Sequence, residues 1–231
     1  MTVGGITVAS TYYYRLSATS TGSGCTSPIV STGSSLQVVA DPTLTAATRT
    51  NSISCQGGST IYTSSLSNGT GTVTYQWQYS ADGSSFSNVV GGTPTGATYT
   101  NPNTTSLTVA NISLVGTYYY RLSATSTGSG CTSPAVSTAA TVQVVADPSV
   151  TASGATTICS GLTANLSSSG SNGTGTMSYQ WQYYNGSTWV NTGTNSNSYT
   201  TQSLAVTTDF RCLYSGTGPG CTTATTNTVT V

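Results

Sequence analysis

Charged side chains carry most acid–base catalysis and ion binding, and this chain of 231 residues has very few of them. It contains four arginines and four aspartates, with no lysine, glutamate or histidine. General acid–base and covalent catalysis depend mostly on histidine, glutamate and lysine. No two aspartates recur together in the repeated pattern described below, so a glycosidase-type carboxylate pair is absent. We therefore predict a protein that is not an enzyme and has no catalytic residues.

Metal and nucleic-acid binding lack their usual residues as well. A calcium cage needs several carboxylates. The six cysteines show no C-x₂-C spacing and have no histidines beside them, which argues against zinc. The net charge is zero, so there is no basic surface for phosphates. We expect no metal, no cofactor and no nucleic-acid partner, and no membrane span, because no apolar run approaches about 18 residues.

Aromatic side chains are the remaining candidates for binding a ligand. Tyr13, Tyr119, Tyr184 and Trp189 could stack on the rings of a surface glycan, as aromatic residues do in carbohydrate-binding modules. The alternative is that Trp189 caps an edge of the fold, while Tyr119 packs against Arg121 on the outer face. We favour packing as the role of these rings.

Strands are the elements that must position these side chains. Serine and threonine number 87, about 38% of the chain, beside 15 tyrosines and 3 tryptophans. Disordered chains are usually highly charged and poor in aromatic and β-branched residues, unlike this one. Large apolar residues alternate with polar ones over 73–79, 118–124 and 177–183. Such strands, with hairpin signals at Asp82-Gly83 and Asn185-Gly186, predict an all-β fold of antiparallel sandwiches.

The sequence repeats itself. Residues 10–42 match 116–148 at 27 of 33 positions. A second correspondence places 55–79 on 159–183 and aligns Cys55 with Cys159, and a third aligns Cys131 with Cys221. The chain is therefore a tandem array of one unit of roughly 85–105 residues.

The phase of the array divides the chain into three parts. Residues 42–147 form one complete repeat, and 148–231 form a second, shorter one. Residues 1–41 correspond only to the closing strands of a repeat. A lone hairpin is marginal in water and exposes open edges. We therefore expect 1–41 to be completed by further sheet, either from upstream sequence or from a neighbouring subunit by strand addition.

Each repeat has the same order of landmarks. A cysteine is followed by Tyr-Gln-Trp-Gln-Tyr at 75–79 or 179–183, then by an aromatic after a turn and by a late strand such as Tyr-Tyr-Tyr-Arg at 118–121. This order resembles the Ig-like tandem repeats of large secreted surface adhesins and type 9 secretion-associated proteins of Bacteroidota. The resemblance implies tandem immunoglobulin-like β-sandwiches and an extracellular or bacterial cell-surface location. Residue parity within the strands places Trp77, Trp181, Tyr120 and Phe210 in the cores.

The cysteines depart from the usual Ig pattern, in which a disulfide joins two core strands around the tryptophan. Leu122 stands at the later strand position, and Cys131 follows nine residues on. The repeat alignment pairs Cys55 with Cys131 and Cys159 with Cys221. Each closed loop would contribute on the order of 4 kcal/mol in the chain-entropy model.

Two cysteines remain unpaired under this scheme. Cys25 has no partner in the chain, and Cys212 is expected to be reduced and buried, in the place of Leu122. The alternative is the usual Ig bond between Cys159 and Cys212, which would leave Cys221 free. Six cysteines without lysine or glutamate also favour an extracellular protein.

Near-identical tandem units with short Ala-Asp-Pro joints and an uncharged polar surface are typical of a spacer. We expect the stalk of a cell-surface adhesin or the body of an extracellular filament. The expected partners are further copies of the same repeat, in the same chain or in neighbouring subunits. The alternative is a carbohydrate-binding Ig-like module of a larger secreted protein.

Overall fold

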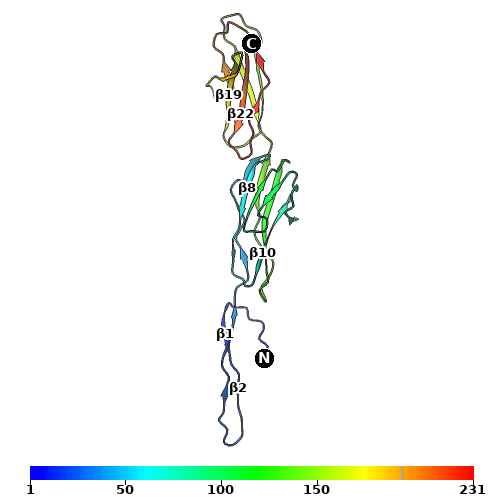
Figure 1. Cartoon of the computed structure of the whole chain (residues 1–231), viewed down its shortest axis with the longest axis vertical. Coiled ribbons are helices and arrows are strands. Elements are labelled where there is room, and N and C mark those ends of the chain that lie inside the picture. The colour runs from blue at the N-terminus through cyan, green and yellow to red at the C-terminus, as the bar shows by residue number, and fades with distance from the viewer. Residues whose placement is uncertain (194) are drawn as a thin grey trace.

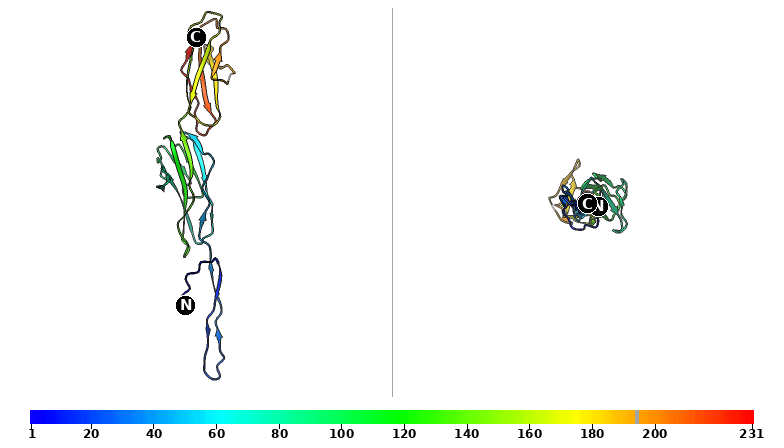
Figure 2. Two further views of the ribbon diagram at one scale, coloured as in Figure 1. Left: turned by 180° about the vertical axis from the view of Figure 1, so that it is seen from behind. Right: turned by 90° about the horizontal axis from the view of Figure 1, so that it is seen from below.

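The computed structural model describes every residue of the chain except Thr194. The described residues form strands and no helices, so the fold is all-β, and none of them forms a helix that could cross a membrane. Two β-sandwiches and an N-terminal hairpin follow one another along a single long axis (Figure 1). Viewed along that axis, the three parts project onto one another (Figure 2). The chain is thus a linear array of immunoglobulin-like β-sandwiches with a hairpin at one end.

The middle sandwich consists of two facing sheets and a short ribbon. One sheet has the order β11 (Ser87–Asn88), β10 (Val73–Ser80), β14 (Gly116–Ser126), β16 (Ala140–Val145) and β7 (Ile53–Cys55), with β15 (Ala135–Val136) also on β14. The other has the order β12 (Thr98–Thr100), β13 (Ser106–Ala110), β8 (Ser59–Thr63) and β6 (Thr48–Arg49). The ribbon pairs β5 (Thr43–Leu44) with β9 (Leu66–Ser67). All these pairings are antiparallel except that of β16 with β7.

Residue alternation explains why the middle sandwich closes around one core. In the β10–β14 register Trp77 faces Leu122 and Tyr79 faces Tyr120, so one side of both strands is apolar. The side chains of Trp77, Tyr120 and Leu122 are fully buried. The indole N–H of Trp77 donates to the carbonyl oxygen of Thr104 at 2.8 Å, which satisfies the one polar atom of that ring.

The last sandwich repeats this plan with fewer strands. One sheet has the order β17 (Ser149–Gly154), β18 (Asn165–Ser171) and β21 (Ser198–Thr200). The other has the order β20 (Trp189–Asn191), β19 (Met177–Tyr184), β22 (Asp209–Gly216) and β23 (Ala224–Thr225), with β24 (Val229–Thr230) also on β22. Trp181 faces Cys212 in the register that pairs Trp77 with Leu122. Trp181, Phe210 and Cys212 are buried in this core, and the Cys212 thiol is free.

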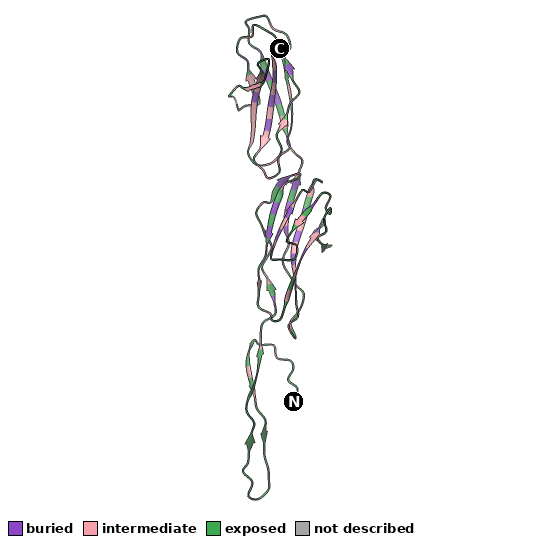
Figure 3. Cartoon of the chain, in the orientation of Figure 1, coloured by how far each residue is buried: buried purple, intermediate pink, exposed green. Residues whose placement is uncertain are grey.

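Residues 1–41 form a ribbon without a core. Strand β1 (Ser10–Tyr14) pairs with β4 (Ser34–Val38), and β2 (Ser17–Ala18) pairs with β3 (Ile29–Val30). The buried residues drawn in purple lie in the two sandwiches, whereas this ribbon is almost entirely exposed (Figure 3). Tyr13 and Ile29 are 78% and 69% exposed. The ribbon therefore presents both of its faces to solvent.

Candidate functional site: the joint between the sandwiches

A disulfide between Cys55 and Cys221 joins the middle sandwich to the last one, with the two Cα atoms 4.8 Å apart. The pairings predicted from the sequence, Cys55–Cys131 and Cys159–Cys221, are wrong. Cys131 and Cys159 are free thiols, like Cys25. The one disulfide that the described residues form therefore links two units.

Strand length explains why Cys55 cannot form a disulfide with Cys131 in the middle unit. In the sheet, Cys55 lies opposite Val145, beside the start of β14, whereas Cys131 follows the end of that strand. Strand β14 has 11 residues. At about 3.3 Å per residue it separates the two cysteines by roughly 33 Å. A disulfide requires Cα atoms within about 7 Å, so Cys131 is out of reach of Cys55, whereas Cys221 of the adjoining unit is not.

Two glycines allow the backbones of the two units to meet. The N–H of Cys55 donates to the carbonyl oxygen of Pro219 at 2.8 Å, a backbone hydrogen bond across the joint. A Cβ on Gly58 would lie 2.7 Å from that same oxygen. A Cβ on Gly220 would collide with the backbone of Gly58, and Gly220 also has a positive φ of 77°. Sequence reasoning missed these residues, and the available signal was the Pro-Gly pair directly before Cys221.

The linkers on the two sides of the middle sandwich differ in their polar contacts. At the first linker the carboxylate of Asp41 accepts the backbone N–H and the hydroxyl of Thr132 at 2.9 and 2.7 Å. The Thr132 N–H, followed by its hydroxyl, lowers the pKa of Asp41. At the second linker one carboxylate oxygen of Asp147 is buried without a partner among the described residues. The disulfide, rather than the aspartate, therefore closes the second joint.

The carboxylate whose pKa is lowered most, that of Asp82, holds a turn. It accepts the N–H groups of Ser84 and Ser85, each at 2.8 Å, and the hydroxyl of Ser80 at 2.7 Å. These hydrogen bonds, the one from Ser85 first, hold the pKa of Asp82 far below its usual range. In the last sandwich the uncharged Asn185 accepts N–H groups in the same manner. Because an amide replaces the carboxylate there, the turn needs an acceptor and not an acid.

An arginine stacks on a half-buried aromatic ring in each sandwich. The guanidinium carbon of Arg121 lies 3.9 Å from the ring centre of Phe86, and that of Arg211 lies 4.2 Å from the ring centre of Trp189. Each arginine also donates from Nε to a glutamine side chain, Gln78 at 2.9 Å or Gln182 at 2.8 Å. This stacking occupies one face of each ring.

The four predicted stacking residues do not share one surface. Tyr13 lies on the ribbon, Tyr119 on the middle sandwich, and Tyr184 and Trp189 on the last one. Tyr119 is half-buried, and a Cβ on Gly83 would lie 3.1 Å from its ring. The rings of Tyr184 and Trp189 are 5.5 Å apart and tilted by 52°. Only this last pair comes together, and Arg211 already covers one side of it.

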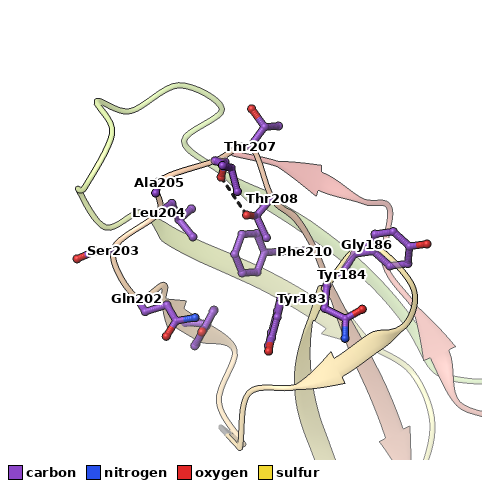
Figure 4. A pocket seen from close by; sticks show the side chains of 13 residues that line it. Tyr183, Tyr184, Gly186, Gln202, Ser203, Leu204, Ala205, Thr207, Thr208 and Phe210 are labelled. Atoms are coloured by element: carbon purple, nitrogen blue, oxygen red, sulfur yellow. Dashed lines mark hydrogen bonds between the residues drawn. The ribbon is translucent and has the colours of Figure 1, made fainter.

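A hollow of about 500 Å³ opens at the outer end of the last sandwich. The loop at 202–208 borders it, and the rings of Tyr183 and Phe210 point into it (Figure 4). Its lining carries no charged side chain and no cysteine. The hollow offers apolar contact surface together with tyrosine rings and a few amide and hydroxyl groups.

Two segments, 44–146 and 149–231, match one family model, described as "Domain of unknown function (DUF8696)". The chain belongs to this family. No curated protein matches the sequence.

Similar solved structures include domains A168–A170 from titin, with 16% identity and a TM-score of 0.43 over 95% of this chain and 74% of that one. The chicken CNTN1 FN1–FN3 domains show 14% identity and a TM-score of 0.37 over 95% and 76%. Murine CEACAM1b shows 14% identity and a TM-score of 0.32 over 83% and 98%.

Proposed function

We propose that this member of the family is a non-enzymatic extracellular structural protein, which serves as the stalk of a cell-surface adhesin or the body of an extracellular filament. The observation that carries the proposal is the Cys55–Cys221 bond between units. A disulfide within a domain stabilises that domain alone. A disulfide across a joint fixes how two domains sit relative to each other, which is what a spacer needs.

The same bond supports the proposed extracellular location. Disulfides form and persist in oxidising environments such as the cell surface and are rare in the cytosol. The low charge of the chain supports end-to-end assembly. With only eight charged residues in total, neighbouring units repel one another very little. A bacterial surface, as in the adhesin repeats that the sequence resembles, is the setting we propose.

The proposed partners are further copies of the same repeat. The ribbon of residues 1–41 leaves Tyr13 and Ile29 exposed, and its strands β1 and β4 correspond to the closing strands of a complete sandwich. A ribbon that buries so little apolar surface gains stability by pairing with additional sheet.

Small-angle scattering tests the proposal by comparing the oxidised chain with the double variant Cys55→Ala/Cys221→Ala. We expect the oxidised chain to be extended and narrow in shape. The variant should keep both sandwiches folded but show a broader distribution of maximum dimensions, because only the linker at 146–148 then restrains the joint. A matched control is Cys131→Ala, which should scatter like the unmodified chain. A compact oxidised chain, with the two sandwiches packed side by side, would contradict a spacer.

A further inference from the structure

The turn that carries Cys55 recurs at Cys159, although Cys159 has no partner. The N–H three residues after each cysteine donates to that cysteine's carbonyl oxygen, at 3.1 Å for Cys55 and 3.2 Å for Cys159. The glycines two residues after each cysteine, Gly57 and Gly161, have positive φ values of 76° and 89°. Each donates its N–H across the end of the sandwich, to Ile112 at 2.9 Å and to Leu204 at 2.8 Å. Cys159 is thus held in the backbone conformation of a bonded cysteine, and it is exposed.

The loop that carries Cys221 recurs at Cys25 and at Cys131, but Cys131 is only partly exposed and lies at the first linker, beside the Thr132–Asp41 hydrogen bond. The N–H of Cys221 donates to the carbonyl oxygen of Gly218 at 3.2 Å, and that of Cys25 to Gly22 at 3.3 Å. The glycine before each cysteine has a positive φ, 77° at Gly220 and 82° at Gly24. Cys25 is exposed and unpaired.

The Cys159 turn and the Cys25 loop lie at opposite ends of the array. The loop between β2 and β3, which contains Cys25, forms one tip of the array, and the loop between β17 and β18, which contains Cys159, lies at the other end (Figure 1). We propose that a second copy of the chain docks head to tail, with Cys159 of one copy bonded to Cys25 of the next. This bond would join two molecules in the way that Cys55–Cys221 joins two units within one molecule. The proposal rests on the structural role above and deepens it by naming the partner and the contact.

The surroundings of both loops fit such a contact. Neither 19–28 nor 155–164 contains a charged residue, so the ends do not repel each other. Beside Cys159, Leu162 and Val206 are 55% and 74% exposed, and a docked unit would cover these apolar side chains. Leu162 is the equivalent of Gly58 in the Cys159 turn. At the existing joint there is no room for a Cβ at Gly58. The joint between copies is therefore somewhat wider than the joint within one.

Bond formation needs an oxidant, and a small disulfide such as oxidised glutathione supplies it. The thiolate of one cysteine attacks the glutathione disulfide and releases one reduced glutathione. The thiolate of the other cysteine then attacks this mixed disulfide and releases the second. In sum, two thiols lose two electrons and two protons, and one oxidised glutathione becomes two reduced molecules.

The test uses the full chain, purified with Cys55–Cys221 formed and then incubated with oxidised and reduced glutathione. We expect a ladder of multimers on a non-reducing gel that collapses to monomer on reduction. Digestion with trypsin and Asp-N protease places Cys25 in peptide 16–40, Cys131 in 122–146 and Cys159 in 147–208. The expected cross-link joins peptide 16–40 to peptide 147–208, and mixing ¹⁴N- and ¹⁵N-labelled chains shows that it connects two molecules.

Complementary variants make the test specific. Cys25→Ser and Cys159→Ser should each remain monomeric, whereas an equimolar mixture of the two should give a dimer and nothing larger. Cys131→Ser serves as the matched control and should keep the full ladder. Recovery of the Cys55–Cys221 peptide from every variant shows that each one has folded.

Three results would overturn the inference: monomers only, links through Cys131 or between two copies of Cys25, or a mixture that gives no dimer. An extended chain that stays monomeric would overturn this inference alone. A chain that is compact by scattering would instead contradict the proposed structural role.

Discussion

The hydroxyl of Tyr62 is a buried polar group without a hydrogen-bond partner among the described residues. Its ring is fully buried and packs against Tyr120 and Trp77, at centroid distances of 4.8 and 6.1 Å. In the repeat register Leu166 takes this position in the last sandwich and is also buried. The site therefore uses the volume of the ring, whereas the hydroxyl is desolvated without compensation.

Replacing Tyr62 by phenylalanine should raise the free energy of unfolding of the middle sandwich by about 1 kcal/mol, because an unsatisfied buried group is removed without leaving a cavity. Denaturant unfolding at neutral pH measures this change. Tyr120→Phe is the matched control. The Tyr120 hydroxyl lies 3.3 Å from that of Tyr99, so its loss should be neutral or should destabilise by up to about 1 kcal/mol. A clear loss of stability in Tyr62→Phe would show that its hydroxyl is bonded.

At the scale of elements, strand periodicity was the part of the structure that the sequence could predict. Alternation over 73–79 and 118–124 indicated antiparallel strands with one buried side, and the predicted class, tandem immunoglobulin-like β-sandwiches, is confirmed. The disulfide could not be predicted in the same way. A repeat alignment shows which cysteines are equivalent, but the pairing depends on β14 being long enough to carry Cys131 to the far end. The glycines at the joint matter only once two units are in contact, which no pattern within a unit reveals.

The two sandwiches should differ in alkaline stability, because the middle core buries tyrosines where the last core has Leu166 and Phe210. Burial raises the pKa of Tyr62 and of Tyr120 far above the ordinary value near 10, and raises that of Tyr99 to about 12. A group with a raised folded pKa contributes its full stability below its unfolded pKa and loses it as the pH rises toward the folded value. Above pH ~10 the middle sandwich should therefore lose about 1.4 kcal/mol per pH unit for each tyrosine that stays protonated.

Hydrogen exchange followed by mass spectrometry between pH 8 and pH 11.5 resolves the two sandwiches separately. Peptides from β10 and β14 should lose protection at a lower pH than peptides from β19 and β22. The last sandwich also contains tyrosines whose pKa burial raises, Tyr199 and Tyr214, so its own decline should come later rather than be absent. The double variant Tyr62→Phe/Tyr120→Phe should remove most of the difference. Loss of protection at one common pH would contradict this account.

At the scale of the whole molecule, the joint between the two sandwiches is the feature on which the proposed function depends. The two sandwiches stand end to end, and within the described residues one disulfide joins them in addition to the backbone linker, between cysteines 166 positions apart in the sequence (Figure 1). Close approach of Gly58 and Gly220 lets the Cys55 turn seat against the loop before Cys221. The rigidity of the array therefore depends on residues that contribute nothing to either core.

Gly220→Ala should weaken the joint, whereas Gly130→Ala, the matched control, should not. Both glycines have similar positive φ values, 77° and 76°, so the backbone cost of a Cβ is similar. Only at Gly220 would the new Cβ meet another unit, since nothing lies within 4 Å of it at Gly130. In glutathione buffers we expect the equilibrium constant for Cys55–Cys221 formation to fall about tenfold in Gly220→Ala, equivalent to about 1.4 kcal/mol. Equal effects of the two substitutions would contradict a packed joint.

Disulfide mapping of the unreduced chain tests the central claim most directly. Trypsin, Asp-N protease and chymotrypsin together separate all six cysteines, including Cys212 from Cys221 through cleavage after Tyr214. A joint clamped between units predicts that the peptide containing Cys55 is recovered linked to the peptide containing Cys221. Recovery of Cys55 with Cys131, or of Cys159 with Cys221 or Cys212, would place the bonds inside single units and contradict the clamped array.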